Sequence, residues 1–262
     1  MRADVFLKER GYAKSRTAAQ DIISRGVTVN GEKIAKPSQN IPDADTYTVE
    51  VAEAQKYVSR GGLKLEAALD AFGISPDGLR AVDIGASTGG FTDCLLSRGA
   101  REVVAVDVGH DQLAKSLATD PRVKNMEGVN ARALTQNDVG GRVPLVVTDV
   151  SFISQSLIYG AVADILDDTG LFISLIKPQF EAGRENIGKS GIVAKDEKIH
   201  VKVIEKLIAE AASHGLGMIS VIPSPIKGGD GNTEYLALFK KGAAVGLLDI
   251  RSCVVAALGG KL

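Results

Sequence analysis

Apolar residues along this chain of 262 residues recur with the period of a strand in some segments and of a helix in others. From Arg80 onward, unbroken apolar runs predict buried strands at 81–84, 103–107, 122–127, 144–149 and 171–176. The intervening and following segments predict helices at 90–98, 111–118, 154–166 and 196–213. Buried strands that alternate with helices are typical of a parallel sheet covered on both faces. We therefore expect an α/β fold with a Rossmann-like sheet.

Two further strands, at 217–222 and 235–240, are joined by a glycine-rich loop and should complete this sheet as an antiparallel hairpin. A last apolar helix is expected at about 245–258.

The first 55 residues follow a different pattern, which predicts a separate small α+β domain. It should hold two short helices, a hairpin that turns at Asn30-Gly31, and a strand at 47–51. A linker at 56–62 ends in Gly61-Gly62, and the next helix carries apolar residues at 65, 68, 69 and 72 on one face. The chain should therefore divide into residues 1–55, the linker 56–62, and a large domain at 63–262.

The net charge of −1 means that any contact with nucleic acid must come from local clusters of charge. Residues 1–25 hold six basic and three acidic side chains, which alone fits a solvated helix pair equally well. The arrangement of helices and hairpin, however, resembles the small RNA-binding domain first seen in a ribosomal small-subunit protein. That resemblance implies phosphate contacts from basic residues of this region: Arg2, Lys14, Arg16 and Arg25.

Several classes of protein are disfavoured by what the sequence lacks. Cys94 and Cys253 are both expected in the core, which leaves no disulfide framework, and three scattered histidines give no metal-ligand spacing. Because Met1-Arg2-Ala3-Asp4 opens no signal peptide and no apolar run has membrane-spanning length, we expect a cytoplasmic protein without a metal and without a membrane partner.

A glycine-rich turn follows the first predicted strand of the large domain. Such a turn lets the backbone approach a ligand, and the following helix start offers free N–H groups. An acid at the end of the second strand, Asp107, is placed to hold a ribose diol. The glycines read G-x-x-x-G-G and lack the dinucleotide spacing, so S-adenosylmethionine is favoured over NAD. The candidate cofactor residues are Asp83, Gly85, Ser87, Thr88, Gly89, Gly90, Phe91 and Asp107.

Ligands of open parallel sheets bind beyond the carboxyl ends of the strands, where Asp149 and Lys177 also fall. The segment from Asp149 to Phe152 is not the Asn-Pro-Pro-aromatic loop of base amine methylation, and no cysteine nucleophile is placed for carbon methylation. An oxygen or another simple nucleophile remains as the methyl acceptor. Structural interpretations stay open for three side chains: a helix cap for Asp149, a snorkelling edge residue for Lys64, and a solvated carboxylate for Glu234.

The segment Gly183–Ser190 matches G-x-x-x-x-G-K-S, the phosphate-loop pattern of nucleotide triphosphatases. Its context argues against that function, because five residues separate it from the preceding strand and Gly191-Ile192-Val193 is a poor helix start. A loop beside the site that grips RNA phosphates through Arg184 and Lys189 fits better.

Four segments together resemble the TlyA family, whose members are often labelled hemolysins and join an RNA-binding domain to an FtsJ-like methyltransferase domain. These segments are 57–65, 83–92, 149–154 and 177–181. The resemblance implies S-adenosylmethionine-dependent 2′-O-methylation of ribosomal RNA, on cytidine in the best-known members. It also implies a catalytic tetrad of Lys64, Asp149, Lys177 and Glu234 and an adenine contact near Glu127 or Asn130.

Two other functions remain to be weighed. A non-catalytic ribosome assembly factor could retain this fold and bind ribosomal RNA or ribosomal subunits, although all four tetrad residues are present. A cytolysin is suggested only by the family label. The sequence does not decide whether Lys177 acts as a base or only orients the acceptor hydroxyl.

Overall fold

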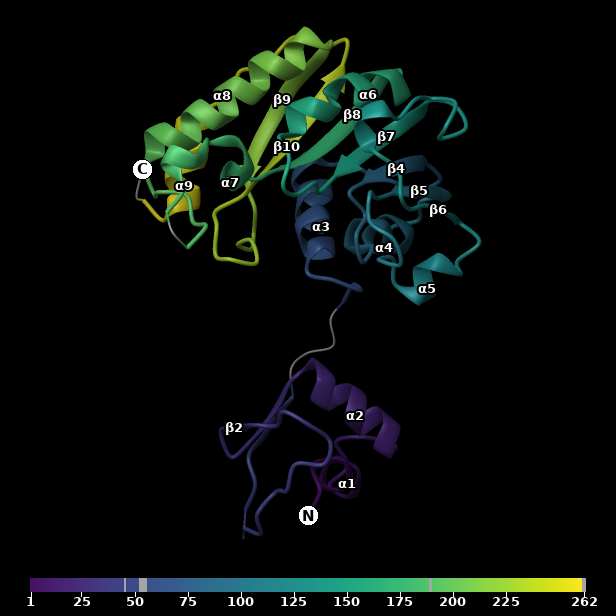
Figure 1. The fold of residues 1–262 in the computed structure, drawn as a ribbon, viewed down its shortest axis with the longest axis vertical. Helices are drawn as coiled ribbons and strands as arrows, with labels where there is room; N and C mark the ends of the chain where they lie inside the picture. The colour runs from purple at the N-terminus through teal and green to yellow at the C-terminus, as the bar shows by residue number, and fades with distance from the viewer. Residues whose placement is uncertain (45, 52–55, 189, 261–262) are drawn as a thin grey trace. The chain divides into compact units, whose positions relative to one another are not determined.

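The computed structural model describes residues 1–44, 46–51, 56–188 and 190–260. The chain forms two compact units, Met1–Lys56 and Tyr57–Leu262 (Figure 1).

The N-terminal unit packs two helices against a small antiparallel sheet. The helices are α1 (Ala3–Glu9) and α2 (Arg16–Arg25), and the strands are β1 (Val27–Val29), β2 (Glu32–Lys33) and β3 (Val49–Val51), in the order β2-β1-β3. Ser15 caps α2, because its hydroxyl accepts a hydrogen bond from the Ala18 N–H at 3.1 Å. Phe6, Leu7 and Ile23 are buried between the helices and the sheet. The predicted α+β fold is confirmed.

A seven-stranded sheet, counted within the described residues, is the centre of the C-terminal unit, in the order β6-β5-β4-β7-β8-β10-β9. Strands β4 to β8 are parallel, and β10 runs antiparallel to both β8 and β9. Their bounds are β4 (Arg80–Ile84), β5 (Glu102–Val106), β6 (Val123–Met126), β7 (Val143–Thr148), β8 (Leu166–Ile176), β9 (Leu216–Pro223) and β10 (Tyr235–Lys241). This order confirms the predicted Rossmann-like sheet and its antiparallel hairpin.

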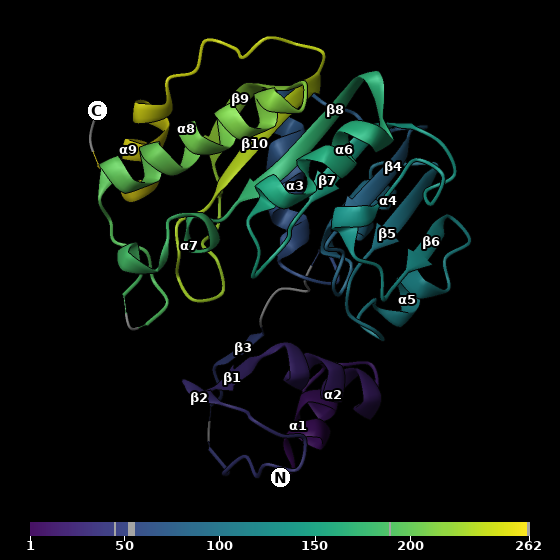
Figure 2. The ribbon, with the colours of Figure 1, turned by 45° about the horizontal axis from the view of Figure 1, so that its top comes forward.

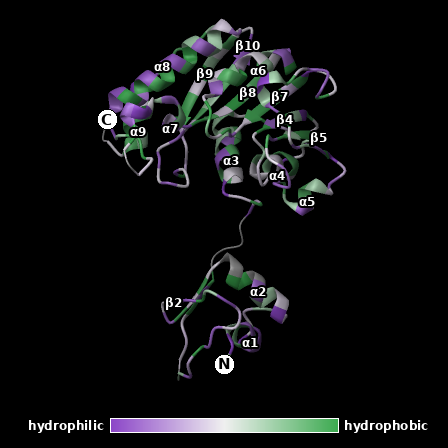
Figure 3. Ribbon diagram, in the orientation of Figure 1, coloured by the Kyte–Doolittle hydropathy of each residue, from purple (hydrophilic) through white to green (hydrophobic). Residues whose placement is uncertain are grey.

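Helices cover both faces of the sheet, as Figure 2 shows. One face packs on α3 (Gly61–Phe72), α4 (Gly90–Ser97) and α5 (Lys115–Ala118), and the other on α6 (Tyr159–Ile165), α8 (Glu197–Ser213) and α9 (Ile250–Leu258). Successive residues of a strand point to opposite faces of the sheet. In β7, Val146 packs on the face of α6, α8 and α9, and Val147 packs on the face of α3, α4 and α5. Central strands such as β5 and β7 are therefore almost continuously hydrophobic (Figure 3).

Three predicted helices differ from the observed ones at their N-terminal ends. Helical structure predicted from residue 111 begins only at Lys115, because the N–H groups of Asp111, Gln112 and Leu113 donate to the Glu127 carboxylate at 2.8–3.0 Å. The predicted helix at 154–166 starts as a 3₁₀ turn, Gln155–Ile158, before α6. Residues from 245 precede α9 and follow the edge of β9, where the Gly246 N–H donates to the Met218 carbonyl at 2.8 Å.

Short helical turns complete the loops around the sheet. They are α7 (Pro178–Glu181) and the 3₁₀ turns Ala131–Ala133 and Arg184–Asn186. The helix α7 directly follows β8, so its residues lie at the carboxyl edge of the sheet.

Glycine is required at position 62 by packing, since a Cβ built there would lie 2.3 Å from the Tyr57 ring. In a helix, Gly→Ala ordinarily stabilises by about 0.5–1 kcal/mol. We expect Gly62→Ala to lower the free energy of unfolding by about 1–3 kcal/mol instead, because the buried Tyr57 ring must move. Urea denaturation measures this difference.

Gly61→Ala is the matched control in the same helical turn. Its Cβ would meet neighbours only at 3.4 Å and beyond, an ordinary contact distance. This variant should be as stable as the parent or slightly more stable. Equal stability of the two variants would contradict the packing argument.

Candidate active site

Two cavities open at the carboxyl edge of the sheet and share residues of the glycine-rich turn. The first, of about 300 Å³, is lined by Lys64, Lys177 and Lys227 among others, and we call it the lysine cavity. The second, of about 530 Å³, is lined by Asp107 and Asn130 among others, and we call it the Asp107 cavity. The lining residues common to both are Gly85, Ser87, Asp149 and Ser151.

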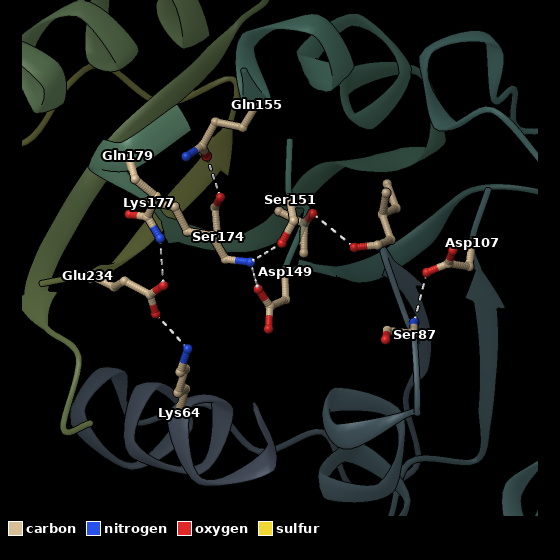
Figure 4. Close-up of polar contacts among 12 residues, drawn as sticks. Lys64, Ser87, Asp107, Asp149, Ser151, Gln155, Ser174, Lys177, Gln179 and Glu234 are labelled. Atoms are coloured by element: carbon tan, nitrogen blue, oxygen red, sulfur yellow. Dashed lines mark hydrogen bonds and ion pairs between the residues drawn. The ribbon is translucent and has the colours of Figure 1, made fainter. Parts of the chain in front are cut away.

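Two ion pairs stand at the lysine cavity (Figure 4), and the Asp149 carboxylate is the one partner among them that is partly exposed. The Nζ atom of Lys64 lies 2.5 Å from Oε2 of Glu234, and Nζ of Lys177 lies 2.6 Å from Oδ1 of Asp149. Lys177 also donates to Oγ of Ser151 at 2.7 Å. A buried ammonium is costly unless it is paired, so these contacts account for the low exposure of both lysines, 8% and 9%.

The fold brings the four side chains together from separate segments. Lys64 stands in the first turn of α3, Asp149 follows β7, and Lys177 follows β8. Glu234 precedes β10, whose Tyr235 pairs with Ile176 of β8, so the antiparallel register sets Glu234 close to Lys177. Glu234 is only 3% exposed and also accepts from the Gln179 amide at 3.2 Å. It is therefore not a solvated edge carboxylate.

The glycine-rich turn is held by Asp107. Its Oδ2 accepts from the Ser87 N–H at 2.8 Å and its Oδ1 from the Gly109 N–H at 2.7 Å. The turn has positive φ at Gly85 (81°), Ser87 (48°) and Gly89 (98°). Four of the predicted turn residues line the lysine cavity: Ser87, Thr88, Gly90 and Phe91. Gly89 instead faces the side chains of α5 and of the loop before it.

Asp83 lies behind the turn and lines neither cavity. Its side chain is fully buried and accepts from the Thr92 hydroxyl at 2.7 Å, while Oδ1 has no hydrogen-bond partner within the described residues. Burial raises the pKa of Asp83 to about 7 against the lowering effect of the Thr92 hydrogen bond, and the charges of Asp149 and Asp107 add to the rise.

The family resemblance implies an adenine contact near Glu127 or Asn130, and these two residues have different surroundings in the structure. The Glu127 carboxylate already accepts three backbone N–H groups of the turn before α5, which lower its pKa. Asn130 lines the Asp107 cavity. Only Asn130 is therefore placed to contact a ligand there.

Phe152 is a functional candidate that sequence reasoning quoted only as part of a motif. Its side chain is 88% exposed, its φ is 65°, and its ring centroid lies 5.2 Å from that of Phe180. Nζ of Lys177 lies 5.9 Å from the centroid of the Phe180 ring. An aromatic residue in a predicted site loop, outside any strand or helix period, was the available signal.

Three residues of the segment after β7 contact the segment after β8. Asp149 and Ser151 contact Lys177, and Phe152 contacts Phe180. Glu181 then accepts from the Ser154 hydroxyl at 2.7 Å and from the Gln155 N–H at 2.8 Å. Burial raises the pKa of Glu181, and those two hydrogen bonds oppose the rise. Glu181 therefore fixes the end of the loop that begins at Asp149.

In the N-terminal unit, two predicted RNA-binding residues share one buried carboxylate. Arg2 and Arg16 donate to Asp4, whose side chain has no exposed surface, at 2.7–3.2 Å. The hydrogen bonds from both guanidinium groups hold the pKa of Asp4 well below its usual range. Each arginine side chain remains about half exposed, at 50% and 53%, so its other donors can reach a ligand.

The other predicted RNA contacts are placed as follows. Lys14 and Arg184 are exposed, whereas Lys189 and the side chain of Arg25 lie outside the described residues.

In the segment that matches a phosphate loop, a short 3₁₀ turn at Arg184–Asn186 is observed, and the next helix, α8, begins only at Glu197. The residues of this segment that the structure describes, 183–188 and 190, do not form the strand–loop–helix geometry of a triphosphatase.

Among the described residues, no helix has the length and apolar character needed to span a membrane.

A family model for FtsJ-like methyltransferases matches residues 57–241, and one for the S4 domain matches residues 1–46.

Named relatives resemble the chain over most of its length. It is 44% identical to Hemolysin A of Brachyspira hyodysenteriae, over 91% of this chain and 99% of the relative. It is 43% identical to the 16S/23S rRNA (cytidine-2′-O)-methyltransferase TlyA of Mycobacterium tuberculosis, over 89% of this chain and 87% of the relative. A solved structure from Streptococcus thermophilus, provisionally named a hemolysin, is 42% identical with a TM-score of 0.76 and covers 98% of this chain and 95% of its own. The chain therefore belongs to the TlyA family of FtsJ-like methyltransferases and carries an S4 domain at its N-terminus.

Proposed function

We propose that this protein transfers a methyl group from S-adenosylmethionine to a ribose 2′-hydroxyl of ribosomal RNA, with cytidine as the target nucleoside. The observation that carries the proposal is the pairing of two buried lysines with carboxylates, Lys177 with Asp149 and Lys64 with Glu234, at a cavity that adjoins the Asp107 cavity. The named activity of the Mycobacterium tuberculosis relative supports the choice of acceptor.

The residues around the two cavities fit this cofactor. Asp107 can accept hydrogen bonds from a ribose diol, and Asn130 offers an amide for recognition of a base. The turn residues Ser87, Thr88 and Gly90 border the lysine cavity, where an amino acid end would lie. Asp83 acts from behind the turn by holding Thr92 in the first turn of α4. S-adenosylmethionine would supply an electrophilic methyl group on a sulfonium.

Lys177 is the residue that we assign to the acceptor hydroxyl. Its ammonium group is fixed by Asp149 on one side, and Ser151 Oγ occupies a position that an incoming hydroxyl could take. As the hydroxyl oxygen bonds to the methyl carbon, the carbon–sulfur bond of the sulfonium would break. The hydroxyl proton would pass to the Asp149 carboxylate, because the Lys177 ammonium can only donate and therefore orients the hydroxyl oxygen. Fixed orientation of two reactants is worth up to roughly 10⁵–10⁸ M of effective concentration. Positioning is therefore the main contribution of these residues.

Phe152 supports a nucleotide substrate. An exposed aromatic ring offers a face on which a base can stack, which is worth about 1–3 kcal/mol for each base. Its positive φ costs free energy, and such strain is concentrated at functional sites. In the N-terminal unit, Arg2 and Arg16 supply exposed guanidinium donors for phosphates.

The chemical role of Lys177 can be tested with Lys177→Met, which keeps the apolar stem and removes the charge. We expect methyl transfer to rRNA to fall by about 10²–10⁴-fold. S-adenosylmethionine affinity, measured by calorimetry, should change little. Lys202→Met, on the exposed side of α8, is the control. Full activity of Lys177→Met would remove Lys177 from the reaction. A parent protein that binds RNA but transfers no methyl group would favour a non-catalytic assembly role.

The cofactor assignment can be tested with Asp107→Asn. A hydrogen bond to a charged group contributes about 1.5–3 kcal/mol, so S-adenosylmethionine should bind about 10- to 150-fold more weakly. Asp111→Asn changes an exposed carboxylate on the following turn and should leave the affinity unchanged. Circular dichroism verifies folding, since Asp107 also holds two backbone N–H groups. Equal affinities of the two variants would remove Asp107 from the cofactor site.

The RNA role of the N-terminal unit can be tested with Arg2→Gln and Arg16→Gln, made singly so that Asp4 keeps one guanidinium partner. Each should weaken rRNA binding and make the dependence of log K on log salt shallower by about 0.7–0.9. Lys33→Gln, on β2, removes the same charge away from the two helices. An unchanged salt dependence in both arginine variants would place RNA binding elsewhere.

A further inference from the structure

The lysine cavity contains more positive charge than its two ion pairs account for. Its lining includes four cations, Arg60, Lys64, Lys177 and Lys227, and one acid, Asp149. Lys64 and Lys177 are matched by Glu234 and Asp149. Over the described part of the chain, neither Arg60 nor Lys227 has an ion pair or a side-chain hydrogen bond, and both side chains are exposed.

Each unmatched cation stands next to one of the ion pairs. Arg60 precedes Gly61, where a Cβ would lie only 3.6 Å from Oδ2 of Asp149. Lys227 precedes Gly228, where a Cβ would lie 2.5 Å from Oε1 of Glu234. The backbone of both cations therefore passes directly beside the reacting groups. Side chains that served only solubility would not need this position.

We propose that Arg60 and Lys227 bind the two phosphodiester groups that flank the acceptor ribose. This inference rests on the proposed function, and it names the part of the RNA that the cavity recognises. A guanidinium can bind phosphate oxygens through two parallel hydrogen bonds, and an ammonium attracts phosphate as a point charge. With one phosphate held beside each ion pair, the ribose between them is directed toward Lys177.

The matched lysines cannot perform this task equally well. Their charges are largely neutralised by Asp149 and Glu234, and both are about nine-tenths buried. Phosphate attraction at the cavity mouth therefore depends on the two cations that lack acidic partners. Because such contacts position RNA without reading its sequence, their loss should affect all RNA substrates alike.

The experiment compares Arg60→Gln, Lys227→Gln and the double variant in the full chain. Each single change should raise the KM for rRNA by about tenfold and lower the salt slope of binding by about 0.7–0.9, with S-adenosylmethionine affinity unchanged. The double variant should show both losses together. Arg101→Gln and Lys240→Gln are the controls, because both are exposed and lie at the opposite edge of the sheet, next to Glu102 of β5 and across from Leu171 of β8.

Three outcomes would overturn the inference. If Arg60→Gln weakened S-adenosylmethionine binding and left the salt slope unchanged, the anion at Arg60 would be the carboxylate of the cofactor. If the parent methylated rRNA and the cavity variants behaved like the controls, the two cations would be solvated side chains, and the proposed function would stand. If the parent bound the cofactor but methylated no rRNA, the proposed function would fail and this inference with it.

Discussion

The rule that a buried charge must be paired governs the arrangement of this site. Lys64 and Lys177 lose most of their contact with water, and each is held by a carboxylate at 2.5–2.6 Å. Removing one partner of such a pair typically costs about 3–5 kcal/mol, because it leaves an unmatched charge in the interior. The same pairing joins α3 to the start of β10, and β8 to the loop after β7. The chemistry that we propose and the packing of the C-terminal unit thus depend on the same contacts.

Rigid placement of the loop after β7 follows from this arrangement. Lys177 holds its beginning through Asp149 and Ser151, and Glu181 holds its end through Ser154 and the Gln155 N–H. Between these two anchors, Phe152 adopts a positive φ and extends into solvent. A strained backbone conformation persists only when its surroundings fix it, and two anchored ends provide that condition. The exposed ring is therefore held in a set position rather than left free.

The sheet and most residues of the candidate site could be predicted from the sequence. Buried parallel strands are unbroken apolar runs, so the sheet and its carboxyl edge were readable, and the family resemblance grouped Lys64 with Glu234. Residue patterns alone favour solvated positions for Lys64 and Glu234. The two are 170 residues apart in the sequence, and only the folded sheet brings them together. The hydrophobic pattern also does not predict the late start of α5. The N–H groups of residues 111–113, which precede the helix, bind the carboxylate of Glu127, a residue that follows β6. The motif predicts Asp83 as a cofactor residue, and the structure buries its side chain behind the turn, outside both cavities.

The distribution of charge explains how a chain with a net charge of −1 can be suited to RNA. Neutralised cations and free cations have different uses. Lys64 and Lys177 are neutralised by neighbouring carboxylates, which permits their burial at the cavity. Arg2 and Arg16 share one carboxylate and stay half exposed, so Asp4 fixes their geometry and leaves charge in excess. Arg60 and Lys227 have no acidic partner within the described residues, and their attraction for phosphate is undiminished. A polyanion is attracted at the places where basic side chains lack acidic partners. The net charge of the chain, which is near zero, does not reveal these local sites.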